Sequence, residues 1–266
     1  MPSLRMAATL WAAGLRSNLQ YRVDFVLTMS WGLIRQGIGF VLIWVILSRF
    51  QALAGWSLGD VAFLYGLRLV VHALVGLVTG QIWSLQWMVR NGDFDRYLVR
   101  PAPPLLLLLC EQVPMPAFGE LLGGLVLFGA ANTLVGLAWT PQALLYLVLA
   151  LVGGTLVELA IRLLVVSFSF RVLSVDGLMR LLDGFFSDFG TYPLSIFDAA
   201  LQFLLTFGIP VAFMAYFPAV VLLGRTGELQ VHPIFAYGAP LAGVVWMALA
   251  LYVFQREMRH YQSAGH

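Results

Sequence analysis

Long apolar segments separated by short polar stretches dominate this sequence and constrain its fold more than any other feature. Of the 266 residues, 61% are hydrophobic and only 11% are charged. A helix needs about 20 consecutive apolar residues to cross the hydrocarbon core of a membrane. The sequence therefore predicts an all-α, polytopic membrane protein, with room for about six spans and their connections.

Hydropathy and helix-end signals predict where the chain crosses the membrane. The clear spans are residues 25–47, 61–82, 116–137, 144–166 and 235–254. Two segments compete for one further span. Residues 199–223 are strongly apolar, but they contain Pro210 and Pro218, which interrupt a straight helix. Residues 171–190 would be about 30 Å long as a helix, but they carry three charged residues on one helical face. These three are Asp176, Arg180 and Asp183.

The first 22 residues predict an amphipathic helix ahead of the first span. Apolar residues recur there at spacings of three and four, at Leu4, Ala8, Trp11, Leu15 and Leu19. Such a helix can lie in the cytoplasmic interface of the membrane. A plain extension of the first span fits the same residues equally well. No cleavable signal peptide is expected, because arginines occur throughout and no short apolar core precedes a small-residue cleavage site.

Residues 84–104 form the longest polar interruption in the first half of the chain. They hold Arg90, Arg96 and Arg100, and short loops rich in arginine stay on the cytoplasmic side of a membrane. Counting the arginines on each side of the predicted spans then places both termini in the cytoplasm.

A short helix is expected inside this loop. Asp93 follows a turn signal and can cap a helix that begins at Phe94. Phe94, Tyr97 and Leu98 would share one face, because residues three and four apart are neighbours on a helix. A soluble partner could bind that face. The alternative is that residues 92–101 only cap the next span and anchor it at the lipid headgroups.

Lysine is absent, since all fifteen basic residues are arginine. A nucleotide-binding P-loop needs a lysine on the phosphates, so any ATPase that drives this protein is expected to be another polypeptide. The one cysteine, Cys110, excludes an intramolecular disulfide. The four histidines are dispersed along the chain and not spaced as metal ligands, which disfavours a membrane-embedded enzyme.

Ionisable residues fall within the predicted spans, at Arg35, Arg68, His72, Glu120, Glu158 and Arg162. Each would cost about 2.5–3.5 kcal/mol at mid-bilayer if it faced lipid. They are therefore expected to face protein or water. Glu158 and Arg162 are four residues apart, so the sequence predicts that they form an ion pair on one helix.

Arg68 and His72 share a helical face and need an acid from another part of the chain. Glu120 and Glu111 are the candidates. Buried pairs of this kind would lock the helices together, whereas a proton relay would use acids without fixed partners. An ion-gradient-driven secondary transporter or channel is therefore only the alternative function, since neither an internal repeat nor an unpaired acid cluster is evident.

Several short motifs are scattered over residues 92–265. The first is Gly92–Pro101, GDFDRYLVRP, and the others are YPLSIF at 192–197, IPV at 209–211, YFPA at 216–219 and YQSAG at 261–265. Together they resemble the signature of small ABC-2-type permeases, the membrane subunits of bacterial ABC exporters.

This resemblance implies a single permease domain over residues 1–266, with six transmembrane helices, an interfacial helix over residues 1–22 and a re-entrant segment before the last helix. It implies no catalytic residue, metal or cofactor on this chain, because ATP and Mg would bind a separate ABC ATPase. The other expected partners are a second permease copy or a sibling permease and membrane lipid, with no nucleic acid. The expected location is the bacterial inner membrane, with both termini cytoplasmic.

The resemblance also implies roles for particular segments. Residues 84–104 would be a cytoplasmic coupling loop that docks on the ATPase through Asp93, Phe94, Asp95, Arg96, Tyr97, Leu98 and Arg100. Residues 171–190 become the fifth span, and residues 191–224 become the re-entrant region. The charged stripe of Asp176, Arg180 and Asp183 is then a candidate lining of the transport path.

Overall fold

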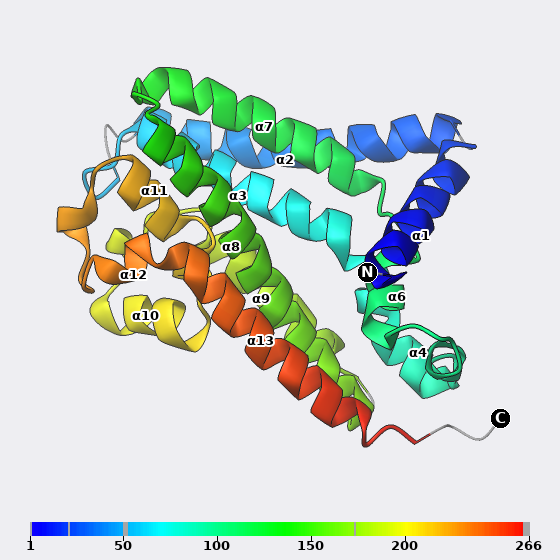
Figure 1. Cartoon of the computed structure of the whole chain (residues 1–266). Coiled ribbons are helices and arrows are strands. Elements are labelled where there is room, and N and C mark those ends of the chain that lie inside the picture. Colours follow the sequence, from blue (N-terminus) through cyan, green and yellow to red (C-terminus); the bar gives the residue numbers. More distant parts are fainter. Residues whose placement is uncertain (1, 21, 50–52, 173, 263–266) are drawn as a thin grey trace.

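The structure, a computed structural model, describes residues 2–20, 22–49, 53–172 and 174–262. Its regular elements in this part of the chain are helices (Figure 1). Four helices are long and apolar enough to cross a membrane: α3 (Leu58–Thr79), α7 (Pro116–Val135), α8 (Pro141–Ser167) and α13 (Ala239–Met258). They are preceded by α1 (Pro2–Leu19) and by the 28-residue α2 (Arg22–Arg49).

The long helices pack as two neighbouring pairs. α3 packs on α7, α8 packs on α13, and α3 also contacts α8, while α2 lies along α7 (Figure 1). Glycines allow the backbones to approach closely. A Cβ atom added to Gly153 would lie 2.6 Å from the Cα atom of Pro240, a distance that real Cβ contacts do not reach.

The directions of α2, α3 and α7 follow from their contacts. Gly76 faces Ala117 and Gly66 faces Phe128, so α3 and α7 are antiparallel. Gly123 of α7 faces Gln36 of α2, while Gly32 faces Pro116. α2 therefore runs in the same direction as α7.

The helices end in two differently built regions. The α4–α6 end consists of α4 (Leu85–Asn91), α5 (Asp95–Leu98) and α6 (Pro104–Cys110), and α1 packs against α6 there. The α10–α12 end consists of α10 (Ala199–Phe203), α11 (Tyr216–Leu222) and α12 (Ile234–Tyr237). The described N-terminal and C-terminal segments both lie at the α4–α6 end (Figure 1).

α8 and α13 run in the same direction. Gly153 contacts Pro240 near the start of α13, while Phe170 just after α8 packs on Phe254 near the end of α13, with 5.6 Å between ring centroids. The chain between these helices must therefore return from the α4–α6 end to the α10–α12 end. α9 (Asp176–Phe189) makes part of this return, since it begins beside α4 and ends near the middle of α3.

The structure corrects two details of the expected layout and bears out a third. A continuous helix over 171–190 is wrong, because α9 has only 14 residues, about 21 Å. Residues 199–223 are broken, as Pro210 and Pro218 predict: α10 continues as a π-helical turn to Gly208, and the chain then leaves the helix at Ile209. Met214 packs against Gly154 in the middle of α8. In the loop, α5 begins at Asp95, and Asp93 does not cap it.

Replacing Gly153 by alanine tests the close packing of α8 on α13. The added methyl group would collide with the backbone of Pro240, so we expect a loss of about 1–3 kcal/mol in stability, seen as a lower melting temperature in detergent. Gly129→Ala is the matched control, because a Cβ there meets no atom within 4 Å. A Gly153→Ala protein as stable as the control would contradict this packing.

Candidate functional site

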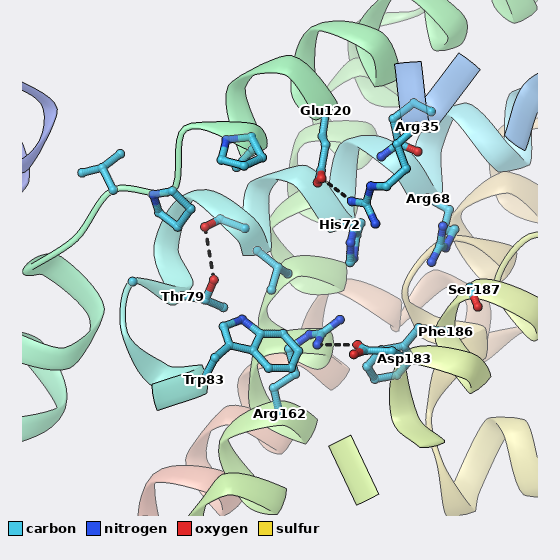
Figure 2. Close-up of a pocket in the computed structure, with 18 of the residues that line it drawn as sticks. Arg35, Arg68, His72, Thr79, Trp83, Glu120, Arg162, Asp183, Phe186 and Ser187 are labelled. Atoms are coloured by element: carbon cyan, nitrogen blue, oxygen red, sulfur yellow. Dashed lines mark hydrogen bonds and ion pairs between the residues drawn. The ribbon is translucent and has the colours of Figure 1, made fainter. Parts of the chain in front are cut away.

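One face of α3 is polar although the helix is otherwise apolar. Tyr65, Arg68, His72 and Thr79 follow helical spacing and line one large cavity of about 1510 Å³. The opposite wall is built by α8 and α9, and α2 and α7 close one side (Figure 2). The ionisable residues of the predicted spans meet around this space.

Arg162 is the most heavily engaged cation of the cavity wall. Its Nη2 atom lies 2.7 Å from Glu158 Oε1, and its Nη1 atom lies 2.8 Å from Asp183 Oδ1. The guanidinium carbon is 4.6 Å from the ring centroid of Trp83 and 5.1 Å from that of Phe186. The ion pair with Glu158 that the i, i+4 spacing predicts is therefore present, and two aromatic rings and a second acid complete it.

Neither of the acids expected for Arg68 and His72, Glu120 and Glu111, pairs with them. Glu120 forms an ion pair with Arg35 of α2 (Figure 2). Nδ1 of His72 on α3 lies 2.7 Å from Oε1 of Glu158 on α8. Glu111 interacts with Tyr97 and lies 3.5 Å from Arg100 at the α4–α6 end. Helical spacing could not supply these pairs, because they join different helices.

Arg68 is left without a partner among the described residues. Only 7% of its surface is exposed, and its Nε atom is buried without a hydrogen bond. The structure places it beside Gly190, just after α9, where an added Cβ would lie 3.3 Å from Nε. Arg68 is the exception in a wall whose other buried charges are paired.

The charged stripe of α9 is divided between two environments. Asp183 lines the cavity, while Arg180 is exposed and lies outside the cavity wall. Asp176 accepts a hydrogen bond from Gln86 of α4. Only Asp183 of the three predicted path residues therefore borders this space.

The predicted docking face in the loop points largely inward. Phe94 and Tyr97 are completely buried, which contradicts the expectation that both meet a soluble partner. Phe94 packs 5.2 Å from Phe170 and 5.1 Å from Tyr261, measured between ring centroids. Tyr97 places its hydroxyl 2.9 Å from Gln81 Oε1 and beside Glu111. Burial raises the pKa of Tyr97, and Glu111 raises it further.

Within residues 92–101, the exposed apolar surface is instead the loop tip formed by Leu98 and Val99. Leu98 is 46% exposed and Val99 is 82% exposed. Asp93, Arg96 and Arg100 are exposed around them, and Asp95 is partly buried. Sequence reasoning did not single out Val99, although an apolar residue between Leu98 and an arginine in a polar loop was a usable signal.

Other cavity residues were also missed. Gln36, Tyr65 and Asp188 line the space, and so does Trp83, which follows the end of α3. Tyr65 lies three residues before Arg68 and therefore on the same face of α3, and this spacing could have identified it. Nothing in the local sequence indicates that Trp83 stacks on Arg162.

A comparison with protein-family models matches residues 33–265 to the ABC-2 family transporter protein model. The chain belongs to the ABC-2 family of transporter proteins. Membrane components of such transporters typically lack catalytic activity. Among the described residues, no group of three or more His, Cys, Asp and Glu side chains could hold a metal ion. The searches of curated proteins and of solved structures gave no match.

The Arg162 cluster predicts how charge-removing substitutions combine. Arg162→Gln leaves Glu158 buried with His72 as its one remaining ion pair among the described residues, so we expect a loss of about 3–5 kcal/mol and a low folded yield. The double variant Glu158→Gln, Arg162→Gln removes both charges and should give more folded protein than Arg162→Gln alone.

Fluorescence-detected size exclusion after expression measures these yields. Arg180→Gln serves as the control, because Arg180 is an exposed arginine outside the cavity wall. If the losses of yield in Glu158→Gln and in Arg162→Gln simply add in the double variant, Glu158 and Arg162 do not depend on one another.

Proposed function

We propose that this ABC-2 family protein is the membrane-spanning subunit of an ATP-driven exporter in a bacterial inner membrane. A separate ABC ATPase would bind and hydrolyse ATP, and a second permease copy or a sibling permease would complete the transporter. The observation that supports this proposal best is the loop tip at Leu98 and Val99, which is apolar, exposed and mounted on a buried aromatic base. A soluble ATPase can bind such a tip.

The same proposal includes six membrane crossings with both termini in the cytoplasm. α2, α3, α7 and α8 alternate in direction, and the parallel course of α8 and α13 requires one return between them. α9 and the residues after it would make that return, and residues 191–224 would form the re-entrant region. The arginines Arg90, Arg96, Arg100, Arg256 and Arg259 belong to the α4–α6 end, which favours that end as the cytoplasmic one.

The packing offers a route from the docking tip to the cavity. Tyr97, next to the tip, contacts Gln81, and Gln81 lies between α3 and α4 and lines the cavity. Phe94 contacts Phe170 after α8 and Tyr261 after α13. A displacement of the tip by ATP-dependent closure of the ATPase would therefore reach the ends of three long helices.

Charge at the loop tip tests the docking role. Leu98→Asp and Val99→Asp place a carboxylate in an apolar contact, which costs several kcal/mol unless it is paired. We expect both variants to insert normally but to lose most of the ATPase that co-purifies with the wild-type protein. Val172→Asp is the control, since Val172 is also 47% exposed at this end but lies outside the loop. Unchanged co-purification of all three variants would remove the loop tip as the docking element.

Labelling of a single cysteine tests the topology. With Cys110 replaced by serine, we expect Ala200→Cys in α10 to react with a membrane-impermeant thiol reagent in intact cells. Val99→Cys should react only after the cells are opened. If Ala200→Cys also reacts only after the cells are opened, residues 199–223 are a span that begins in the cytoplasm. That result would exclude the re-entrant layout.

A further inference from the structure

We propose that Arg68 binds the single acidic group, a carboxylate or a phosphate, of an amphiphilic substrate in the cavity. This inference rests on the proposed transport function and specifies the chemistry of its substrate. It begins from the difference between Arg68 and the other cations of the wall. Arg162 has two acids, His72 has Glu158, and Arg35 has Glu120, whereas Arg68 has neither an ion pair nor a hydrogen bond within the described part of the chain.

The acids around Arg68 are engaged elsewhere. Glu158 Oε1 is shared by Arg162 and His72, and Asp183 binds Arg162. Asp188 accepts a hydrogen bond from Ser187 and is exposed. The second oxygen of Glu158, Oε2, is buried without a hydrogen bond and does not bond Arg68 either, so none of these acids contacts its guanidinium. An external anion could supply that contact.

The position of Arg68 suits a ligand. A guanidinium buried without a partner is strongly unfavourable, and the C-terminal end of α9 beside it supplies only partial negative charge. The guanidinium has five N–H donors in a planar fork, which matches the oxygens of a carboxylate or phosphate. Figure 2 shows Arg68 and His72 on one side of the cavity and Arg162 and Asp183 on the other.

The rest of the cavity indicates the rest of the molecule. Tyr65, Trp83, Phe186 and Tyr192 contribute aromatic surface to the wall. The cavity of about 1510 Å³ exceeds the range of about 300–1,000 Å³ typical of drug-sized ligands. Arg68 is the one buried cation of the described wall without a bonded partner, since Arg96, which also lines the space, is exposed and bonds the Tyr97 hydroxyl. One acidic group therefore fits at Arg68, and a second negative charge would meet Asp183, Asp188 or Glu120. The expected ligand is therefore a large amphiphile with one acidic group.

The experiment compares an acid with its neutral ester. The full-length permease is reconstituted in phosphatidylcholine nanodiscs, and the probes are dansyl-labelled undecanoate and its methyl ester, with empty nanodiscs subtracted. We expect the wild-type protein to bind the acid about 10- to 100-fold more tightly than the ester, as for a hydrogen-bonded charge pair. Arg68→Gln should bind both probes with the weaker affinity, and Arg68→Lys should keep part of the preference.

Matched measurements separate binding from folding. Arg68→Gln removes a buried charge without a partner, so its melting temperature should not fall below that of the wild type. Arg180→Gln, which changes an exposed arginine off the cavity, should keep the full preference. Equal binding of acid and ester by the wild type, or a preference that survives in Arg68→Gln, would overturn the proposal. So would a wild-type protein that binds neither probe.

Two competitors identify the source of the anion. Displacement of the probe by inorganic phosphate supports capture of a free anion, and displacement by phosphatidylglycerol in the nanodisc supports capture of a lipid headgroup. The assay needs no ATPase. A failure here therefore leaves the docking proposal standing, and a failure of ATPase co-purification leaves the anion site standing.

Discussion

A guanidinium inside an apolar helix bundle must be compensated, and the compensation of Arg162 organises the centre of this protein. Its partners come from three places, namely Glu158 on the same helix, Asp183 on α9 and the ring of Trp83 after α3. Burying such a charge without its partners costs several kcal/mol. Separating these three elements would therefore be strongly unfavourable. The position of α9 against the bundle, and so the shape of the cavity, depends on this cluster.

Hydropathy and spacing predict a large part of the architecture, and they fail where tertiary contacts decide. The four apolar helices, the separate N-terminal helix and the contact of Glu158 with Arg162 follow from local patterns. The pairs of Arg35 with Glu120 and of His72 with Glu158 join distant segments, so no spacing rule could choose them. In the loop, the helical period indicates which residues share a face, but not that Phe170 and Tyr261 cover that face.

Aromatic clusters and ion pairs hold the chain together at both ends of the bundle. At the α4–α6 end, aromatic rings of Phe94, Phe170 and Phe254 form a continuous apolar cluster. At the α10–α12 end, Arg225 bonds to Asp60 at 3.0 Å and to the carbonyl oxygen of Gly55 at 2.9 Å, so it ties the chain after α11 to the start of α3. The α4–α6 end also has a directional contact, since Arg171 forms an ion pair with Glu257, and at the α10–α12 end Trp56 stacks on Tyr216.

The parallel course of α8 and α13 has a consequence for synthesis. α13, the helix that covers α8, leaves the ribosome about 70 residues after α8 itself. At about 5–20 residues per second, α8 waits several seconds for that neighbour. As soon as α8 forms, before α9 and α13 are synthesised, Glu158 and Arg162 can neutralise one another within a single helix. A pair four residues apart can thus protect a nascent membrane helix at the translocon, where a pair between helices could not yet form.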